Sequence, residues 1–295
     1  MHFSTFDQLF QAYKEKIAAN IRESAEKFNQ AQEHLMKFRE ERFDEYFADI
    51  REKGLPADWY GRSPMCPLPY LSGLFHGAVE NAADMVYESY PVKEKGMMLG
   101  TATEALNSLA AIKKVVYDDK RCTLEDVVKA CRENYKGEGQ EVLRNLLWNA
   151  PKWGNDDDYA DSIAAELLEY GLAEIHKYKT FSGGQMLAGI HQPHPVPTGE
   201  RLAATPEGRF AHTPAAVTLT PESGTMKNGP TAALKSASKL NPELIQWNFC
   251  VMVNYFASVF KGNDGVKVFQ DLLAGYFKRG GLQHQPNILD VNELK

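Results

Sequence analysis

Strand-like sequence is confined to the second half of this chain, and that placement constrains the fold more than any other feature. Residues 181–192 and 244–256 are rich in apolar, β-branched and aromatic side chains, as buried strands are. A helical pattern follows at 263–278, and a third short strand pattern lies at 282–291. Helices first, then strand, helix and strand, are typical of an α/β fold rather than an all-helical one.

The first half of the chain consists of helical patterns. Residues 5–50 repeat apolar side chains such as Phe6 and Phe10 at three- and four-residue intervals, which predicts a long amphipathic helix. Ser4 and Thr5 supply a capping signal at its start. Further helices are expected at 70–90, 102–117, 124–135, 140–149 and 157–178, and the Pro- and Gly-rich residues 191–230 are expected to form irregular loops.

Composition excludes several classes of partner. There are 33 Lys and Arg residues against 39 Asp and Glu residues, a net charge of −6, whereas a general nucleic-acid or anionic-membrane binder needs a basic face. No stretch reaches the roughly 18 apolar residues that a membrane span requires. The four cysteines form no CxxC pair and the N-terminus does not have the pattern of a signal peptide, so we expect a cytoplasmic protein with reduced thiols.

An unbroken acidic run, Asn155–Asp158, is a candidate cation site. A calcium loop of the EF-hand type alternates its ligands, whereas these carboxylates are adjacent and cannot easily converge on one ion. Aspartates just before a helix instead accept backbone N–H bonds and suit the helix dipole. The spacing therefore favours a turn that caps the helix at 157–178 over a metal site.

Other motifs give weaker signals. His191 and His194 could bind zinc together with Glu200, but no HExxH helix or cysteine pair accompanies them, and loop packing or a substrate contact is the alternative. Lys235 follows a Gly-Pro-Thr start that could mark a phosphate site, or simply a small-residue helix packed against a neighbour. No P-loop, GxGxxG fingerprint or GxSxG elbow is present, and Cys66 has no nearby histidine that would mark a nucleophile.

Several segments resemble the pyruvate formate-lyase family of glycyl radical enzymes. Ala150–Asp161 resembles the family's P-K-Y-G-N-D-D-D-Y-V-D, and Gly229–Leu240 matches G-P-T-A-x-L-K-S-x-S-K-L almost letter for letter. The other matching segments are Thr5–Tyr13, Asn107–Gly137, Ala203–Pro214 and Gly280–Asp290. Together they extend over nearly the whole chain, which is identified as a member of this family.

The resemblance implies a fold and its subdivision. Residues 1–295 are expected to form part of the α/β barrel of glycyl radical enzymes, a partial pyruvate formate-lyase-like domain with a helix-rich N-terminal half and a strand- and loop-rich C-terminal half. Within it we expect a long helical segment at 1–55, a helical layer at 56–180, and barrel strands with substrate-facing loops at 181–295.

The chemistry that the resemblance implies is radical catalysis in a dry barrel. An activating enzyme of the radical SAM (iron–sulfur) type abstracts hydrogen from a backbone glycine, and the glycyl radical then generates a thiyl radical on a cysteine that attacks the substrate. The loops with this cysteine and glycine are expected before Met1 and beyond Lys295, so the chain alone is expected to be catalytically incomplete, with no catalytic residue, metal ligand or bound cofactor of its own. Cys66 lies in a different family segment from the cysteine loop.

A finer resemblance concerns the reaction. The segment Gln283–Asn287, with Pro286 in place of the usual Phe, is most similar to the large (alpha) subunits of alkyl- and arylalkylsuccinate synthases of the benzylsuccinate type. These enzymes add a hydrocarbon C–H bond across fumarate in anaerobic hydrocarbon degradation. An arylacetate decarboxylase, or another glycyl radical lyase or dehydratase, is the alternative. A non-catalytic scaffold or subunit built on a remnant barrel is the alternative from another class.

The resemblance also assigns partners and site residues. The partners expected are the activating enzyme, small accessory subunits, a second copy of the full-length chain and a small-molecule substrate, but neither nucleic acid nor membrane. Candidate substrate contacts are His194, Val196 and Thr198, with Met97, Met98 and Thr101 as a second wall, although core packing is the commoner role of a Met pair. The family-motif residues expected to be structural are Asn155, Asp156, Asp157, Asp158, Arg209, Lys235 and His284. Arg209 is expected to pin a loop rather than to bind a substrate carboxylate.

Overall fold

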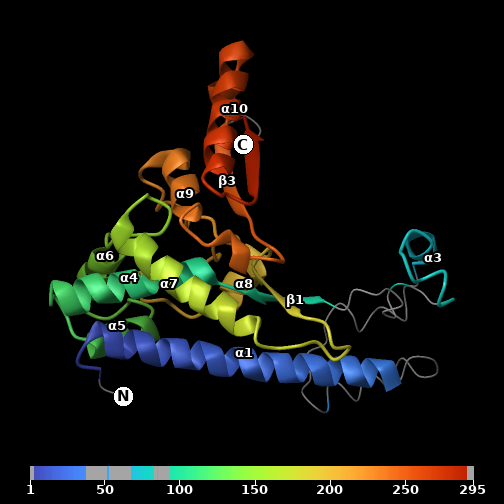
Figure 1. Cartoon of the computed structure of the whole chain (residues 1–295). Helices are drawn as coiled ribbons and strands as arrows, with labels where there is room; N and C mark the ends of the chain where they lie inside the picture. Colours follow the sequence, from blue (N-terminus) through green and yellow to red (C-terminus); the bar gives the residue numbers. More distant parts are fainter. Residues whose placement is uncertain (1–2, 38–51, 53–67, 83–84, 86–93, 291–295) are drawn as a thin grey trace. The chain divides into compact units, whose positions relative to one another are not determined.

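The computed structural model describes residues 3–37, 52, 68–82, 85 and 94–290 (Figure 1). Its contacts divide the chain into two compact units. The first comprises Met1–Lys14, Met98–Ala173 and Ala188–Lys295, and the second comprises Glu15–Met97 and Glu174–Leu187. Among the residues described, no helix is long and apolar enough to cross a membrane.

The N-terminal helix, α1, begins where the sequence predicts a long amphipathic helix. It runs from Phe6 to Lys37. The backbone N–H of Gln8 donates to Thr5 Oγ1 at 3.3 Å, so Thr5 caps the helix. The backbone N–H of Ser4 donates to Gln8 Oε1 at 2.9 Å. The remainder of the predicted helix, residues 38–50, lies outside the described residues.

The helix predicted at 70–90 is wrong for most of its described length. A single turn, α3 (Pro69–Ser72), is followed by turns through residue 82. Gly73 caps the helical turn and Gly77 has a φ of +91°, a conformation that ends helical geometry.

The remaining helices, with the exception of α8, lie close to their predicted positions. They are α4 (Ala102–Ile112), continued by a π-helical turn (Lys113–Asp118), α5 (Leu124–Arg132), α6 (Gln140–Trp148), α7 (Asp158–Ile175), α8 (Pro195–Arg201), α9 (Gly229–Ala237) and α10 (Gly262–Lys278). Short 3₁₀ turns occur at Pro242–Leu244 and Ala257–Phe260. Helix α5 begins with a complete capping box between Thr123 and Asp126.

Helix α8 corrects the expectation that residues 191–230 are entirely irregular. Pro195 is the first residue of α8 and Pro197 the third, positions at which a helix needs no N–H hydrogen bond, so these prolines begin the helix rather than break it. Gly199 is packed so closely against residues 213–215 that a side chain there would collide with their backbone.

The strands form two pairs. β1 (Lys95–Leu99) pairs with β2 (Met186–Ile190), and β3 (Val251–Phe256) pairs in parallel with β4 (His284–Leu289). Helix α10 connects β3 to β4 and runs alongside them (Figure 1). The sequence predicts β2, β3 and β4 but gives no signal for β1. The order helix, strand, helix, strand confirms the α/β class.

The core of the first unit surrounds α4. Ala105 is the one residue of this helix that is not buried. The largest fully buried side chains around it include Trp153, Leu147 and Leu219. A helix enclosed on all sides is normally apolar throughout, but α4 also buries Thr103, Glu104, Asn107 and Ser108. These polar groups require partners inside the protein.

Candidate functional site

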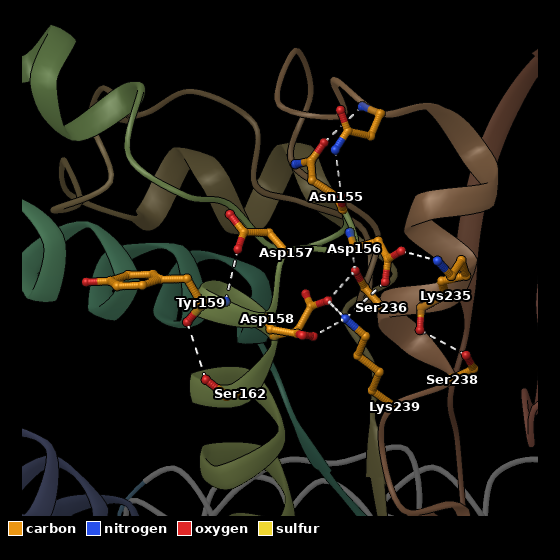
Figure 2. A network of polar contacts seen from close by, with 12 residues as sticks. Asn155, Asp156, Asp157, Asp158, Tyr159, Ser162, Lys235, Ser236, Ser238 and Lys239 are labelled. Atoms are coloured by element: carbon orange, nitrogen blue, oxygen red, sulfur yellow. Dashed lines mark hydrogen bonds and ion pairs between the residues drawn. The ribbon is translucent and has the colours of Figure 1, made fainter.

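The Asn155 side chain joins two loops (Figure 2). Its Nδ2 donates to the carbonyl oxygens of Lys152 and Thr225, at 3.2 and 3.0 Å. Its Oδ1 accepts the backbone N–H groups of Lys227 and Asn228, at 2.7 and 3.1 Å. One buried amide therefore holds the turn before α7 against the segment that leads into α9.

Asp156 connects the same turn to α9. Its φ of +54° is a left-handed conformation that aspartate tolerates better than most residues. Its backbone N–H donates to Ser236 Oγ at 2.9 Å, and its carboxylate pairs with Lys235 and with Lys239, the latter at 3.0 Å (Figure 2). The hydrogen bond from Lys235, followed by that from Lys239, holds the pKa of Asp156 below its usual value.

Asp157 has the predicted capping role. Its Oδ1 accepts the backbone N–H of Tyr159 at 3.0 Å, one residue beyond the first residue of α7. Asp158 Oδ1 accepts from Lys239 Nζ at 2.7 Å, and the same ammonium donates to the buried Asp161 at 2.7 Å. The run is therefore a turn in which Asp157 caps the helix and the carboxylates of Asp156 and Asp158 contact lysines.

We call this set the acidic-turn network: Asn155, Asp156, Asp157, Asp158, Asp161, Lys235, Ser236 and Lys239. Lys235 lies in the last turn of α9 and not at the helix N-terminus, so the phosphate-site interpretation has no geometric support. Sequence reasoning missed Ser236, Lys239 and Asp161. Ser236 and Lys239 lie in the same motif as Lys235, but Lys239 follows the end of α9, so helical spacing does not place it beside Lys235.

The two groups of candidate substrate contacts lie in different secondary-structure elements. The first group, Met97, Met98 and Thr101, lies in β1 and just before α4. Met97 and Met98 are in β1, and Met98 is 44% exposed. Thr101 precedes α4 with a φ of +50°, and its hydroxyl does not cap the helix. Both methionines thus lie in a strand rather than in the buried core, and their role as substrate contacts stays a prediction.

The second wall is the start of α8. Val196 is 52% exposed, and His194, also exposed, immediately precedes the helix. Gln192 Nε2 donates to the His194 carbonyl oxygen at 2.8 Å and also to Thr198 Oγ1, which fixes this loop. His191 turns its Nδ1 toward Thr218 Oγ1 at 3.2 Å, and burial lowers its pKa.

Arg209 pins a loop, as predicted. The buried guanidinium donates to the carbonyl oxygens of Ala203, Phe210 and Thr213, the last at 2.8 Å. His284, another family-motif residue, contacts the Val251 carbonyl oxygen through Nδ1 at 2.8 Å and the Tyr255 hydroxyl through Nε2 at 3.0 Å. Both side chains hold backbone in place.

A second polar region was missed by sequence reasoning. It contains Glu104, Lys152, Glu207, Arg209 and Glu222, all buried, and we call it the buried polar centre. Glu207 accepts hydroxyl groups from Ser108 and from Thr205, the latter at 2.8 Å. Lys152 donates to the carbonyl oxygens of Leu147 and Ala150. The residues of the buried polar centre are spread over more than a hundred positions of the sequence, so no local motif predicts them.

Burial changes the acid–base behaviour of the buried polar centre. Burial, together with repulsion from Glu207 and Glu104, raises the pKa of Glu222 to about 8. It also raises the pKa of Glu207 and lowers that of Lys152 to about 8. Among the described residues, no ion pair joins Lys152 or Arg209 directly to any of the three carboxylates.

The described cysteines are packed thiols. Cys122, Cys131 and Cys250 are free, and burial raises the pKa of Cys122 to about 11. Cys131 contacts the Tyr135 hydroxyl, and Cys250 is buried at the start of β3. Cys66 lies outside the described residues. Among the described cysteines and histidines, no group of three metal-ligating side chains is close enough to hold an ion.

Comparison with known families identifies the chain. The pyruvate formate lyase-like family model matches residues 10–194, and the glycine radical model matches residues 216–295. The chain therefore belongs to the pyruvate formate-lyase-like glycyl radical enzymes. Its fold is part of their α/β barrel, as the sequence resemblance predicted.

Individual relatives cover the chain to different extents. Trans-4-hydroxy-L-proline dehydratase of Clostridioides difficile is 29% identical over 99% of this chain and 34% of its own length. Indoleacetate decarboxylase of Tractidigestivibacter scatoligenes is 29% identical over 75% of this chain and 28% of its own. A structure from Roseburia inulinivorans, described for 1,2-propanediol dehydration, superposes with a TM-score of 0.80 at 27% identity, over 99% of this chain and 34% of that one.

These matches refine the expected reaction. The chain spans about a third of the length of the relatives it matches. These three relatives act in dehydration and decarboxylation, which favours the lyase and dehydratase alternative over fumarate addition. The resemblance to succinate synthases at Pro286 in β4 has no support among these relatives.

Proposed function

We propose that this chain is part of a glycyl radical lyase that removes water from a small hydroxylated substrate. The proposal rests on how much of this chain each relative matches. The dehydratase relative and the propanediol-dehydration structure both match 99% of the chain, whereas the decarboxylase matches 75%. A match over nearly all of this chain includes the loops that shape a substrate pocket. Such a match bears more on the substrate class than one that leaves part of the chain out.

The chain's own contribution is the barrel wall and its loops. In such an enzyme a glycyl radical, formed by a radical SAM activating enzyme, would supply the radical chemistry through a cysteine thiyl radical. Gln192 orders the loop before α8, so that Val196 and Thr198 present a fixed surface. Such a mixed apolar and hydroxyl surface suits a small substrate with hydroxyl groups. The acidic-turn network, meanwhile, holds α7 to α9.

The test uses the full-length enzyme. Anaerobic activation with a radical SAM activating enzyme is expected to give the glycyl doublet in electron paramagnetic resonance spectra. The activated enzyme is then offered vicinal diols and hydroxyproline, arylacetates, or an alkylbenzene with fumarate. Consumption of a hydroxylated substrate supports the proposal. Turnover of an arylacetate, or of the hydrocarbon with fumarate, would replace it with decarboxylation or fumarate addition.

Matched variants locate the substrate wall. Val196→Ala and Thr198→Ala are expected to raise KM at unchanged glycyl radical content, because the radical is formed elsewhere in the enzyme. Val142→Ala, an exposed valine on α6, is the control and is expected to leave KM unchanged. Equal KM values for Val196→Ala and Val142→Ala would remove the α8 loop from the substrate site.

Two other functions have their own outcomes. The decarboxylase alternative is supported by the indoleacetate decarboxylase match. The scaffold alternative, a non-catalytic subunit on a remnant barrel, predicts that the full-length protein never shows the glycyl doublet with any activating enzyme tested. Homodimer formation and small accessory subunits stay predictions, which the mass of the purified enzyme would test.

A further inference from the structure

Helix α10 is almost entirely exposed, although its sequence contains many apolar side chains. Of its 17 residues, only Gly265 and Tyr276 are buried. Helix α4 of the same unit is the opposite case, because Ala105 is its one residue that is not buried. A helix with an apolar face normally packs that face against a neighbour. The described residues leave much of the apolar surface of α10 open.

One side of α10 lines a groove of about 740 Å³, which α9 and β3 also line (Figure 1). All three elements belong to the first unit. The α10 residues that line the groove recur at three- and four-residue spacing and therefore form one face of the helix. They are Val268, Asp271, Leu272, Gly275, Tyr276 and Arg279.

The groove is apolar and open to solvent. Phe256, Val259 and Val268 line it, and each is more than half exposed. Leu234 of α9 and Leu272 of α10 add further apolar surface. Single exposed apolar residues are common on proteins, whereas a contiguous apolar groove marks an interaction surface.

Gly275 provides an independent observation at the same place. It lies inside α10 on the groove face, and a Cβ there would have no neighbouring heavy atom within 4 Å. Gly265, in the same helix, is different, because a Cβ there would collide with the backbone of Phe260. Glycine destabilises the interior of a helix relative to alanine and is typical of the close approach of another backbone. Nothing in the described chain makes that approach at Gly275.

We propose that the groove binds an apolar segment of the further polypeptide of the full-length enzyme, which approaches α10 most closely at Gly275. The dehydratase relative and the propanediol-dehydration structure match 99% of this chain over only 34% of their own length. About two thirds of such an enzyme is therefore available to cover the groove. This assignment rests on membership of the family and not on the proposed dehydration reaction.

Two other occupants fit the groove less well. A site for a small molecule encloses most of its ligand, whereas the half-exposed side chains of this groove would leave a ligand in solvent. A two-fold contact between copies joins a surface to itself. A groove has no ridge with which to fill an identical groove.

Gly275→Leu in the full-length enzyme tests the close approach by the sign of its effect. Leucine is the better helix former, so in an open groove the variant would raise the midpoint of urea denaturation. We expect a lower midpoint, because the new side chain occupies the space of the bound segment. Ala274→Leu is the matched control, at an exposed neighbour that does not line the groove, and is expected to leave the midpoint unchanged. An unchanged or raised midpoint for Gly275→Leu, or an equal fall in both variants, overturns the proposal.

Photo-cross-linking identifies the occupant without a destabilising variant. The photoreactive residue p-benzoylphenylalanine replaces Phe256, a similar aromatic side chain that lines the groove, in the purified full-length enzyme. Mass spectrometry is expected to find a cross-link within one chain, to a peptide outside residues 1–295. A cross-link between two copies, a cross-link only to residues 1–295, or no cross-link overturns the proposal. Because neither experiment measures turnover, the substrate assay can fail while this assignment holds, and the reverse.

Discussion

The acidic-turn network and the buried polar centre use the same residue types in opposite ways. In the network, Asp156, Asp158 and Asp161 each lie within 3.0 Å of the Lys239 ammonium. In the buried polar centre, Glu104, Glu207 and Glu222 share a region with Lys152 and Arg209, yet no direct ion pair joins them among the described residues. The acidic-turn network is partly exposed and its carboxylates form ion pairs, whereas the buried polar centre is enclosed and its carboxyl groups form none with the described lysines and arginines.

The difference has a physical cause. A pair of charges at the surface forms at little cost, because water still solvates the outer side of each group. Complete burial removes that solvation, so a charge inside must be held by several hydrogen bonds or lose its charge. The buried polar centre uses both solutions, with carbonyl groups around Arg209 and Lys152 and a raised pKa at Glu222.

Arg209→Lys is expected to be the most damaging substitution. A lysine cannot replace a planar guanidinium that donates to three carbonyl oxygens, so buried acceptors lose their donors. We expect a loss of about 3 kcal/mol in the free energy of unfolding, measured by urea denaturation. The control is Arg201→Lys, an exposed arginine at the end of α8, and equal losses in both variants would contradict the assigned role.

Glu222→Gln tests how the buried carboxyl group of Glu222 changes the free energy of unfolding with pH. The pKa of Glu222 is raised to about 8 in the folded state from 4.5, so its contribution to stability is full below pH 4.5 and is lost as the pH rises through about 8. The variant should therefore gain stability relative to the unmodified chain over this window, by at most about 1.4 kcal/mol per pH unit. Urea denaturation at several pH values measures the difference, and the control Glu243→Gln, at an exposed glutamate, should show none.

Asn155→Ala tests the uncharged part of the acidic-turn network. The amide makes four hydrogen bonds between two loops, and its loss leaves buried backbone groups without partners. We expect about 2 kcal/mol of lost stability at any pH between 5 and 8, because no titrating group is removed. The exposed Asn149→Ala is the control, and a strongly pH-dependent loss would contradict this explanation.

Lys239→Met removes the shared cation of the network. Asp161, whose side chain is 1% exposed, would keep the Ser236 hydroxyl but lose its ion pair, at a cost of about 1–2 kcal/mol. Burial already raises the pKa of Asp161, and removal of the lysine raises it further. The loss should therefore be smaller at acidic pH, where Asp161 binds a proton. Lys267→Met, which breaks an exposed pair on α10, is the control for the same measurement.

The sequence predicted the elements that depend on local signals. The capping signal at Thr5, the long amphipathic helix and the strand at 251–256 all follow from neighbouring residues, and the structure contains them. Prediction from the sequence failed for β1, because the strand is too short to show a pattern. It also failed for α8, where proline suggests a loop although it begins the helix.

The site was predictable only where its residues are contiguous. Asp157 could be assigned as a helix cap because the helix follows it directly. Glu104 and Glu222 could not be linked, since 118 positions separate them and each looks like an ordinary surface glutamate in its own segment. Folding alone brings them together, and the consequence is a pKa that the sequence does not suggest.

Asp158→Ala is expected to have the smallest effect, although this residue belongs to the most conspicuous motif of the sequence. Its side chain is 93% exposed, so its contact with Lys239 is screened by water and salt. We expect a loss below about 0.5 kcal/mol, further reduced at high ionic strength. A loss as large as that of Lys239→Met would mean that Asp158, rather than the buried Asp161, positions the lysine. The difference between the two variants thus decides whether exposure or sequence prominence governs the acidic-turn network.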